Sequence, residues 1–215
     1  MLKIMNDTRN KVLTWAQIKK LQKIRLYAGD IPDIPFYNDL IGLSIRKTDH
    51  RHILHNILEP YPLENNSVAL FQSEDVFEHI QFAKLNNIIN EIYRILRPGA
   101  LFRLSVPDYR CDILKNRSNK DKSGNIFFDP FGGGTVDNPG HVWFPVIENV
   151  RELLSNSCFI NKAKINFLHY YDTDKSFVLK PIDYSEVYIQ RTPDNDERVK
   201  NPRRPMSIVV DLIKD

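Results

Sequence analysis

The sequence predicts an α/β fold in which a mostly parallel sheet carries helices on both faces. Short apolar, β-prone segments alternate along the chain with segments whose apolar residues recur at helical spacing. Turn signals rich in Pro, Gly and Asn separate the two kinds of segment. The hydrophobic fraction of 42% and the charged fraction of 27% are those of a globular chain, and 215 residues make one ordinary domain.

The expected elements follow this alternation from the first helix onward. The first helix covers 12–23, because Trp15, Ile18 and Leu21 lie near one face. Strands are expected at 24–28, 40–45, 53–58, 67–72, 100–106, 163–171 and 206–213, and further helices at 76–96, from Asp108 and at 146–154. The second helix ends at Arg97-Pro98-Gly99, a strong terminator, and Asp108 is placed to cap the third.

Two long segments interrupt the pattern within this single domain, 1–215. The 117–140 segment is polar and contains Gly132-Gly133-Gly134, which provides a hinge or a close backbone approach. The 172–205 segment is charged and has no apolar periodicity. Both leave strands at their carboxyl ends, so we expect them to lie over a pocket as a lid and specificity surface. The alternative is that they cover the sheet or a partner subunit.

Composition excludes several classes of protein. Two cysteines are too few for a disulfide framework, and no apolar run approaches the ~18 residues of a membrane span. The polar segment 1–11 lacks the apolar region of a signal peptide, so a cytoplasmic protein is expected. A net charge of +3 without a strongly basic face argues against nucleic acid as a partner. Eight glycines, against a usual share of ~7%, leave little for a glycine-rich nucleotide loop.

Ligands of such sheets bind at the carboxyl ends of the strands, near the point where the strand order reverses. This rule selects five places in the sequence. They are Ala28-Gly29-Asp30, Leu43-Ser44, Asn56, Ser73-Glu74-Asp75 and Pro107-Asp108.

Three segments resemble the class I S-adenosylmethionine-dependent methyltransferases, in particular their small, type 11-like members. Residues 63–80 contain a Pro- and Asn-bearing turn, a strand and a helix opening that ends in Glu78-His79. Residues 91–108 contain a helix, a Pro-Gly turn and a fifth strand, and residues 141–159 run from a His to a Ser-Cys-Phe helix end. The resemblance covers most of 24–159. It implies a Rossmann-like three-layer sandwich whose last strand, 207–213, is antiparallel.

The resemblance also implies S-adenosyl-L-methionine as cofactor. The residues at the matching positions are Tyr27, Ala28, Gly29, Asp30, Ser44, Asn56, Ser73 and Glu74. The first loop departs from the family's Gly-x-Gly pattern because it holds one glycine, Gly29. Ser44 stands where an acidic residue usually binds the ribose, and a neutral hydrogen bond there is weaker than a charge-assisted one.

The implied reaction is methyl transfer to an oxygen or nitrogen of a small molecule or sugar. A carboxylate or imidazole would accept the proton of the methyl acceptor. The candidates are Asp75, His79, Asp108 and His141. Their alternative roles are structural, with Ser73 or Asp75 capping the next helix and His79 anchoring a loop. The basic residues of the last long segment would hold an anionic substrate or form a solvated charge run; they are Arg191, Arg198, Arg203 and Arg204.

A second hypothesis keeps the fold without the reaction. The reduced first loop also suits a catalytically inactive methyltransferase-like domain that acts as a binding or scaffolding subunit. Neither hypothesis needs a nucleic acid or a membrane, and a homodimer is left open. No metal site is expected, because His50, His52 and His55 lack a standard zinc spacing and a nearby cysteine, and a solvated loop is expected there.

Overall fold

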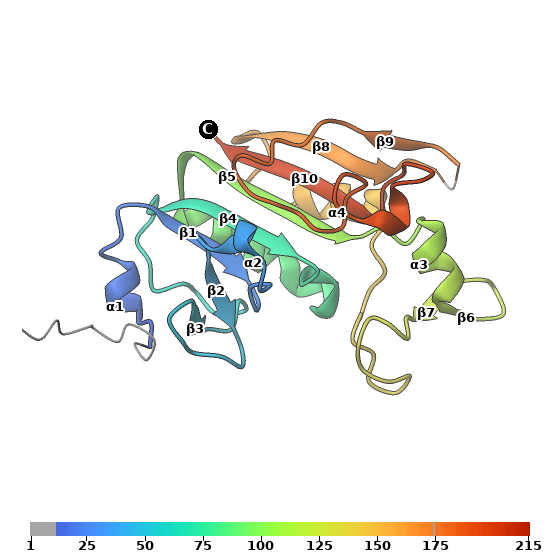
Figure 1. Ribbon diagram of the computed structural model, residues 1–215, viewed down its shortest axis with the longest axis horizontal. Helices are drawn as coiled ribbons and strands as arrows, with labels where there is room; N and C mark the ends of the chain where they lie inside the picture. The colour runs from blue at the N-terminus through green and yellow to red at the C-terminus, as the bar shows by residue number, and fades with distance from the viewer. Residues whose placement is uncertain (1–11, 174) are drawn as a thin grey trace, which may run out of the picture.

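The computed structural model describes residues 12–173 and 175–215, which fold around one eight-stranded sheet (Figure 1). The strand order is β3-β2-β1-β4-β5-β10-β8-β9. The strands are β1 Ile24–Ala28, β2 Ile41–Ser44, β3 His52–Leu54, β4 Val68–Glu74, β5 Leu96–Pro107, β8 Ala163–Tyr171, β9 Phe177–Leu179 and β10 Ser207–Lys214. The first five are mutually parallel, and β10 is antiparallel to both β5 and β8. The expected mostly parallel sheet with an antiparallel last strand is confirmed.

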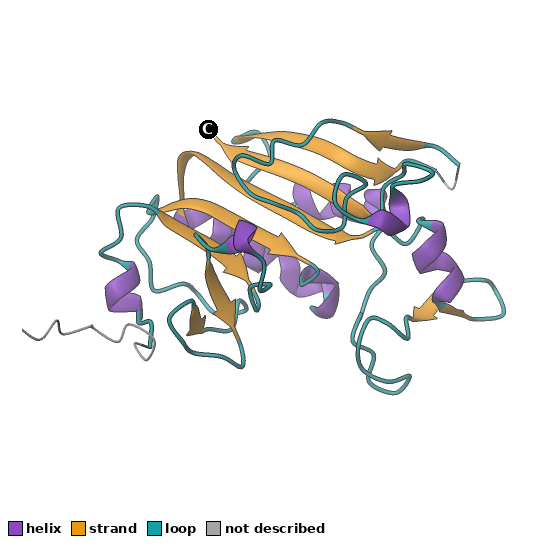
Figure 2. Ribbon diagram, in the orientation of Figure 1, coloured by secondary structure: helices purple, strands orange, loops and turns teal. Residues whose placement is uncertain are grey.

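Helices cover one face of this sheet (Figure 2). The α-helices are α1 Trp15–Ile18, α2 Phe82–Ile95, α3 Asp112–Arg117 and α4 Ile147–Ser155, and the 3-10 helices are η2 Pro35–Tyr37, η3 Phe77–His79 and η4 Glu197–Val199. The buried apolar stripes of α2 and α4 pack with alternate residues of β1, β4, β5 and β10 in one large cluster. This cluster is the main hydrophobic core, because burial of apolar area dominates the stability of such a layer.

Irregular chain covers most of the opposite face, where the sequence predicted further helices. Residues 180–191, here called the strap, run across it, and η2 supplies a helical turn in contact with this side of the sheet. A polar row explains the arrangement, since Gln72, Arg103 and Asp211 are direct cross-strand neighbours on this face. Polar side chains that are buried require hydrogen-bond partners, and the peptide groups of the strap supply them.

The strap is bound through its backbone. Arg103 donates to the carbonyl oxygens of Asp183 at 2.9 Å and Val187 at 2.6 Å. Gln72 donates to the carbonyl of Tyr188 at 2.7 Å. The strap, which is part of the 172–205 segment, therefore covers the sheet. This is the alternative role expected from the sequence for the long segments.

Several expected elements differ in extent. Helix α1 spans four residues instead of the predicted twelve. Ile18 is the one buried residue of this helix, and Leu21, which follows it, is exposed, so a longer helix would bury little more apolar surface. Helix α2 begins at Phe82 rather than at 76, since Asp75 takes a left-handed φ of 55° and η3 intervenes. The predicted loop 117–140 contains a hairpin of β6 Asn119–Lys120 and β7 Ile126–Phe128. Residues 118–140, here called the arm, project beyond the sheet beside α3 (Figure 1).

Asp108 does not cap a helix, contrary to the sequence prediction. Helix α3 starts at Asp112 and its N-cap is Cys111. The two carboxylate oxygens of Asp108 instead accept the backbone N–H of Arg110 at 3.0 Å and of Tyr171 at 2.7 Å. Asp108 thereby joins the carboxyl ends of β5 and β8.

No helix within residues 12–173 and 175–215 has the length and apolar character to cross a bilayer. The segment 1–11, on which the signal-peptide argument depends, lies outside the described residues.

Candidate functional site

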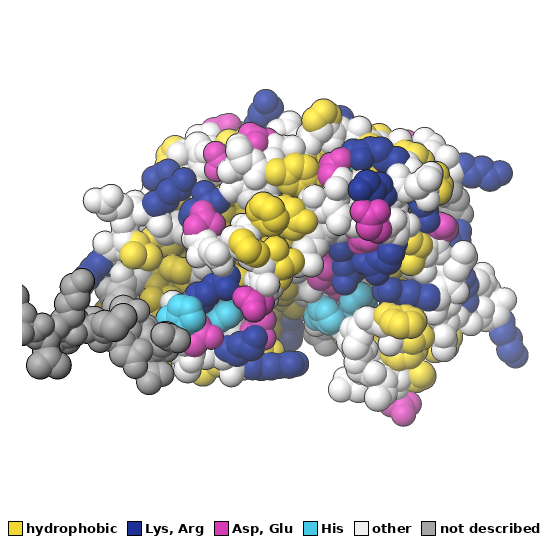
Figure 3. Space-filling view, in the orientation of Figure 1, with side chains coloured by type: hydrophobic (Ala, Val, Ile, Leu, Met, Phe, Trp, Pro, Cys, Tyr) yellow, Lys and Arg dark blue, Asp and Glu magenta, His cyan; other side chains and the backbone are white. Residues whose placement is uncertain are grey.

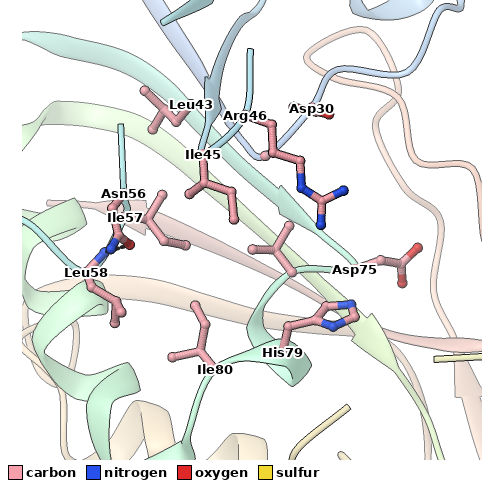
Figure 4. A pocket seen from close by; sticks show the side chains of 12 residues that line it. Asp30, Leu43, Ile45, Arg46, Asn56, Ile57, Leu58, Asp75, His79 and Ile80 are labelled. Atoms are coloured by element: carbon pink, nitrogen blue, oxygen red, sulfur yellow. Dashed lines mark hydrogen bonds between the residues drawn. The ribbon is translucent and has the colours of Figure 1, made fainter. Parts of the chain in front are cut away.

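A cavity of about 420 Å³ opens at the carboxyl ends of β1, β2 and β4, within the size range of small-molecule sites. Its lining comes from the loops after these strands, from the loop after β3 and from η3 (Figure 4). The lining residues are Gly29, Asp30, Leu43, Ile45, Arg46, Asn56, Ile57, Leu58, Asp75, Val76, His79 and Ile80. The strand order reverses between β1 and β4, so the cavity occupies the switch point at which such sheets bind ligands.

Two left-handed residues turn the chain out of the sheet at this point. Gly29 has a φ of 93° and donates its N–H to the carbonyl of Leu43 at 2.9 Å. Asp75 has a φ of 55°, a conformation that costs a non-glycine residue free energy. Such strain is concentrated at functional sites, and here it brings the Asp75 carboxylate to the edge of the cavity.

The cavity has a charged side and an apolar side. Asp30, Arg46, Asp75 and His79 lie on the charged side, and Asn56, Ile57 and Leu58 lie opposite (Figure 4). Asp30 pairs with Lys47 at 3.2 Å. Burial would raise the pKa of Asp30, but its hydrogen bonds with Ser44 and Lys47 lower it, so the carboxylate is charged at neutral pH.

Asp75 is held by Arg191, the last residue of the strap. Its Oδ2 accepts from Arg191 Nε at 2.9 Å, whereas its Oδ1 is buried and has no partner in the described chain. Burial raises the pKa of Asp75, and the Arg191 guanidinium opposes that shift. The cavity therefore has one buried carboxylate oxygen available for a ligand.

The sequence placed five of its twelve candidate residues at this cavity. They are Gly29, Asp30, Asn56, Asp75 and His79. The other seven are buried around it without lining it; they are Tyr27, Ala28, Ser44, Ser73, Glu74, Asp108 and His141.

Local contacts explain the placement of the buried candidates. Ser44 Oγ accepts the backbone N–H of Arg46 at 3.0 Å and of Lys47 at 2.8 Å, so the hydroxyl shapes the loop after β2. Glu74 accepts the Tyr37 hydroxyl at 2.7 Å and the N–H of Gln190 at 2.8 Å. Burial raises the pKa of Glu74, and its role here is to fasten η2 and the strap to the sheet.

Sequence reasoning named Glu78 in the family-like Glu78-His79 pair but did not count it among the candidate site residues. Its side chain is fully buried in η3, and its Oε1 lies 3.7 Å from His141 Nε2 and 4.0 Å from His79 Nε2. The two imidazole rings meet edge to face with centroids 4.7 Å apart. Burial raises the pKa of Glu78 well above its usual range, and the charge of Asp75 adds to the shift. Burial lowers the pKa of His141 to about 4, with His79 adding to the effect.

The glycines of the arm make room for His141. A Cβ added at Gly132 would lie 2.7 Å from His141 Cγ, and one at Gly140 would lie 2.0 Å from the carbonyl oxygen of Gly132. Of the two roles considered for the glycine triplet, close backbone approach is confirmed. Histidine, Lys and Arg side chains gather where the arm leaves the body (Figure 3).

We expect Gly132→Ala to displace the His141 ring and to destabilise the protein by about 1–3 kcal/mol, as overpacking does. Chemical denaturation would measure the loss, and the imidazole NMR signal of His141 would report the displacement. Gly133→Ala is the control for the ring displacement, because a Cβ there meets nothing within 4 Å; its left-handed φ of 77° means that alanine there costs about 1 kcal/mol of backbone strain without moving His141. An unshifted His141 signal in Gly132→Ala would contradict this packing.

The other histidine cluster is not the solvated loop that the sequence predicted. His52 and His55 are buried. His52 Nε2 accepts the N–H of Ile31 at 3.0 Å, and its Nδ1 lies 3.0 Å from Asp49. His55 packs edge to face on Trp15. The two rings fasten the loop after β1 and α1 to the sheet, which the spacing of the histidines does not reveal.

Comparison with known proteins relates part of the chain to a methyltransferase family. Residues 4–104 match the model of a methyltransferase domain family. The fold of the described chain is that of class I methyltransferases. Its fold is similar to that of a protein from Listeria monocytogenes named as a candidate S-adenosylmethionine-dependent methyltransferase, with a TM-score of 0.53 at 16% identity over 94% of this chain and 96% of that one. An S-adenosylmethionine-dependent methyltransferase from Mesorhizobium loti gives a TM-score of 0.51 at 13% identity, over 89% and 91% of the two chains. A search of curated proteins found no match.

S-adenosyl-L-methionine is the cofactor that the methyltransferase family implies, and the cavity fits it. The cofactor combines an apolar base with a zwitterionic amino acid and a sulfonium cation, and the cavity combines an apolar side with opposite charges at Asp30 and Arg46. Gly29 has no Cβ, so the backbone is accessible at this point of the cavity lining; a Cβ added there would lie 3.4 Å from Val76 Cγ2. Asp75, which also lines the cavity, adds a carboxylate whose Oδ1 has no hydrogen-bond partner in the described chain.

The four arginines considered for an anionic substrate are all paired with carboxylates of the described chain. Arg191 pairs with Asp75, Arg198 with Asp196, Arg203 with Asp194 and Arg204 with Asp112. Arg191 alone of these reaches a residue that lines the cavity.

Proposed function

We propose that the chain transfers a methyl group from S-adenosyl-L-methionine to an oxygen or nitrogen of a small molecule or sugar. The observation that carries the proposal is the cavity at the β1/β4 switch point, with charged groups on one side and apolar side chains on the other. When bound, the cofactor supplies an electrophilic methyl group on a sulfonium. The chain's own residues supply binding, orientation and a proton acceptor.

Binding of the cofactor is assigned to the lining residues. Asp30 and Arg46 would hold the ammonium and carboxylate of its amino-acid end, and Asp75 would face its positive charge, because opposite charges attract most strongly where water is excluded. Leu43, Ile57 and their apolar neighbours would cover the base.

His79 is the proposed proton acceptor. Its Nδ1 donates to the carbonyl of Gly140 at 2.8 Å, which leaves a lone pair on Nε2 in the neutral ring. His79 lines the cavity, and its side chain is 41% exposed, so an acceptor molecule can reach it from solvent.

The two long segments are part of this proposal. Gly140 at the end of the arm bonds to His79, and Arg191 at the end of the strap bonds to Asp75. Both contacts support a role for these segments in positioning two residues that line the pocket, His79 and Asp75.

Calorimetric titration with S-adenosylmethionine and S-adenosylhomocysteine tests the assignment. We expect saturable binding of both compounds, and we expect Arg46→Ala to weaken it by about tenfold, because a charge-assisted contact of about 1.5 kcal/mol is lost. Arg97→Ala is the matched control, since Arg97 is equally exposed but lies at the opposite edge of the sheet.

Absence of binding at about 1 mM cofactor would overturn the enzyme assignment, because that concentration corresponds to a free energy of only about −4 kcal/mol. The remaining hypothesis would then be an inactive methyltransferase-like binding or scaffolding subunit. Ser44 favours that alternative, since its hydroxyl is occupied by two backbone N–H groups where the family usually binds ribose.

A further inference from the structure

Glu78 differs from the other buried carboxylates of the described chain. Asp108, Asp129 and Glu74 each accept hydrogen bonds from two or more groups. Both oxygens of Glu78 are buried and have no hydrogen-bond partner in residues 12–173 and 175–215. A buried carboxylate without partners is strongly unfavourable, so its retention indicates a partner that the polypeptide does not provide.

The two histidines beside it present their Nε2 atoms. His79 Nδ1–H is committed to the Gly140 carbonyl. His141 Nδ1 contacts the Tyr109 hydroxyl, and that hydroxyl donates to Asp129 at 2.7 Å, so its oxygen accepts from His141 Nδ1–H. In both neutral rings the lone pair is therefore on Nε2, the atom nearest to Glu78.

We propose that Glu78, His79 and His141 bind a first-row divalent cation, of the class of Zn²⁺, Co²⁺ or Mn²⁺, at the edge of the cavity. One ligand atom from each residue lies within 4.8 Å of the other two. Ligands of a tetrahedral ion at ~2.0–2.1 Å are ~3.4 Å apart. The Nε2–Oε1 separations of 3.7 and 4.0 Å need to close by only a few tenths of an ångström.

The surroundings of the two histidines match those of metal ligands. A ligating imidazole usually donates its other N–H to a carbonyl or to a hydrogen-bonded acid, which fixes its orientation. His79 has the Gly140 carbonyl, and His141 has Tyr109, whose partner Asp129 is in turn held by Arg117 at 2.6 Å.

The ligand set also selects the class of ion. Imidazole nitrogen suits Zn²⁺ and its neighbours, whereas Mg²⁺ and Ca²⁺ prefer oxygen ligands throughout. Three protein ligands leave at least one coordination position open, as in catalytic sites.

The open position would face the cavity, because His79 belongs to both the cluster and the cavity lining. The role of the ion rests on the proposed function. There the ion would occupy the His79 Nε2 lone pair and take the place of His79 in promoting proton loss from a methyl acceptor that binds through a hydroxyl oxygen, because a bound cation lowers the pKa of that hydroxyl.

Metal titration tests this site without reference to activity. Chelator-treated full-length protein is titrated with ZnCl₂ and followed by calorimetry. A second titration with CoCl₂ is followed by visible absorption, because the d–d bands of bound Co²⁺ report four- or five-coordinate cobalt. We expect one ion per chain in wild type and at least about 100-fold weaker binding in Glu78→Gln and His79→Ala. Tyr109→Phe should weaken binding by about 10–100-fold, as loss of a supporting hydrogen bond does. His50→Ala is the control, because His50 is exposed and outside the cluster.

His79→Ala keeps the test decisive even where Glu78→Gln misfolds, since the His79 side chain is 41% exposed. The proposal is overturned by absence of binding to wild type at about 100 μM Zn²⁺ or Co²⁺, or by unchanged binding in a folded His79→Ala protein. Loss of binding in His50→Ala would overturn it too, by assigning the ion to a surface histidine. Titration of the metal-free protein with S-adenosylhomocysteine separates failure of this site from failure of the proposed function.

Discussion

Replacement of Gly29 by Arg is expected to abolish cofactor binding, with a loss of at least about 100-fold, or about 2.8 kcal/mol. Gly29 lines the cavity and has no side chain, so the ligand can approach its backbone. An arginine side chain there would occupy the cavity next to Val76 and bring a positive charge to the site of a cationic cofactor. Calorimetric titration with S-adenosylmethionine would measure the loss.

Gly99→Arg is the matched control for this experiment. Gly99 has a φ of 76°, close to the 93° of Gly29, so arginine adds the same charge and a similar backbone strain. Gly99 begins β5 at the opposite edge of the sheet, and a Cβ there meets nothing within 4 Å. Cofactor affinity in Gly99→Arg should equal that of wild type. An unchanged affinity in a folded Gly29→Arg protein would refute the proposed cofactor position.

The sequence was most informative where local pattern and topology agree. Strands β1 and β8 occupy the predicted ranges 24–28 and 163–171, because their apolar residues are bounded by clear turn signals. Once parallel strands are expected, the residues after their carboxyl ends must share one edge. That rule placed Gly29, Asp30 and Asp75 at the same cavity, although 46 positions separate the first from the last.

The sequence was least informative where long-range pairing decides the structure. The 172–205 segment reads as a solvated charge run because its hydrogen bonds are made by its backbone, which sequence does not display. The sequence did not predict that Glu78, His79 and His141 form a cluster, and the reason is related. His141 is 62 positions from His79, and only the fold of the arm brings it back to η3. The adjacent Glu78-His79 pair in the helix opening was the available signal.

Replacement of Arg103 by Leu is expected to have the largest effect on stability, about 3–5 kcal/mol. Its guanidinium is 1% exposed and forms a two-pronged pair with Asp211, at 2.6 and 2.7 Å, besides holding the two strap carbonyls. Removing it leaves the Asp211 carboxylate and these carbonyls without a donor in a mostly buried place, which costs the full desolvation of each group. The loss is a large part of the ~5–15 kcal/mol available to an ordinary domain. Chemical denaturation measures it directly.

The physical cause is tested by two further variants. Arg203→Leu removes an arginine that also binds one carboxylate, Asp194, and one carbonyl, but its side chain is 51% exposed. That change should cost less than about 1 kcal/mol, since water replaces the lost partners. The double variant Arg103→Leu with Asp211→Leu removes the unpaired charge and should be more stable than Arg103→Leu alone. Equal losses at Arg103 and Arg203 would show that the polar row does not hold the strap. The strap would then depend on the apolar contacts of Val187 and Ile189 alone.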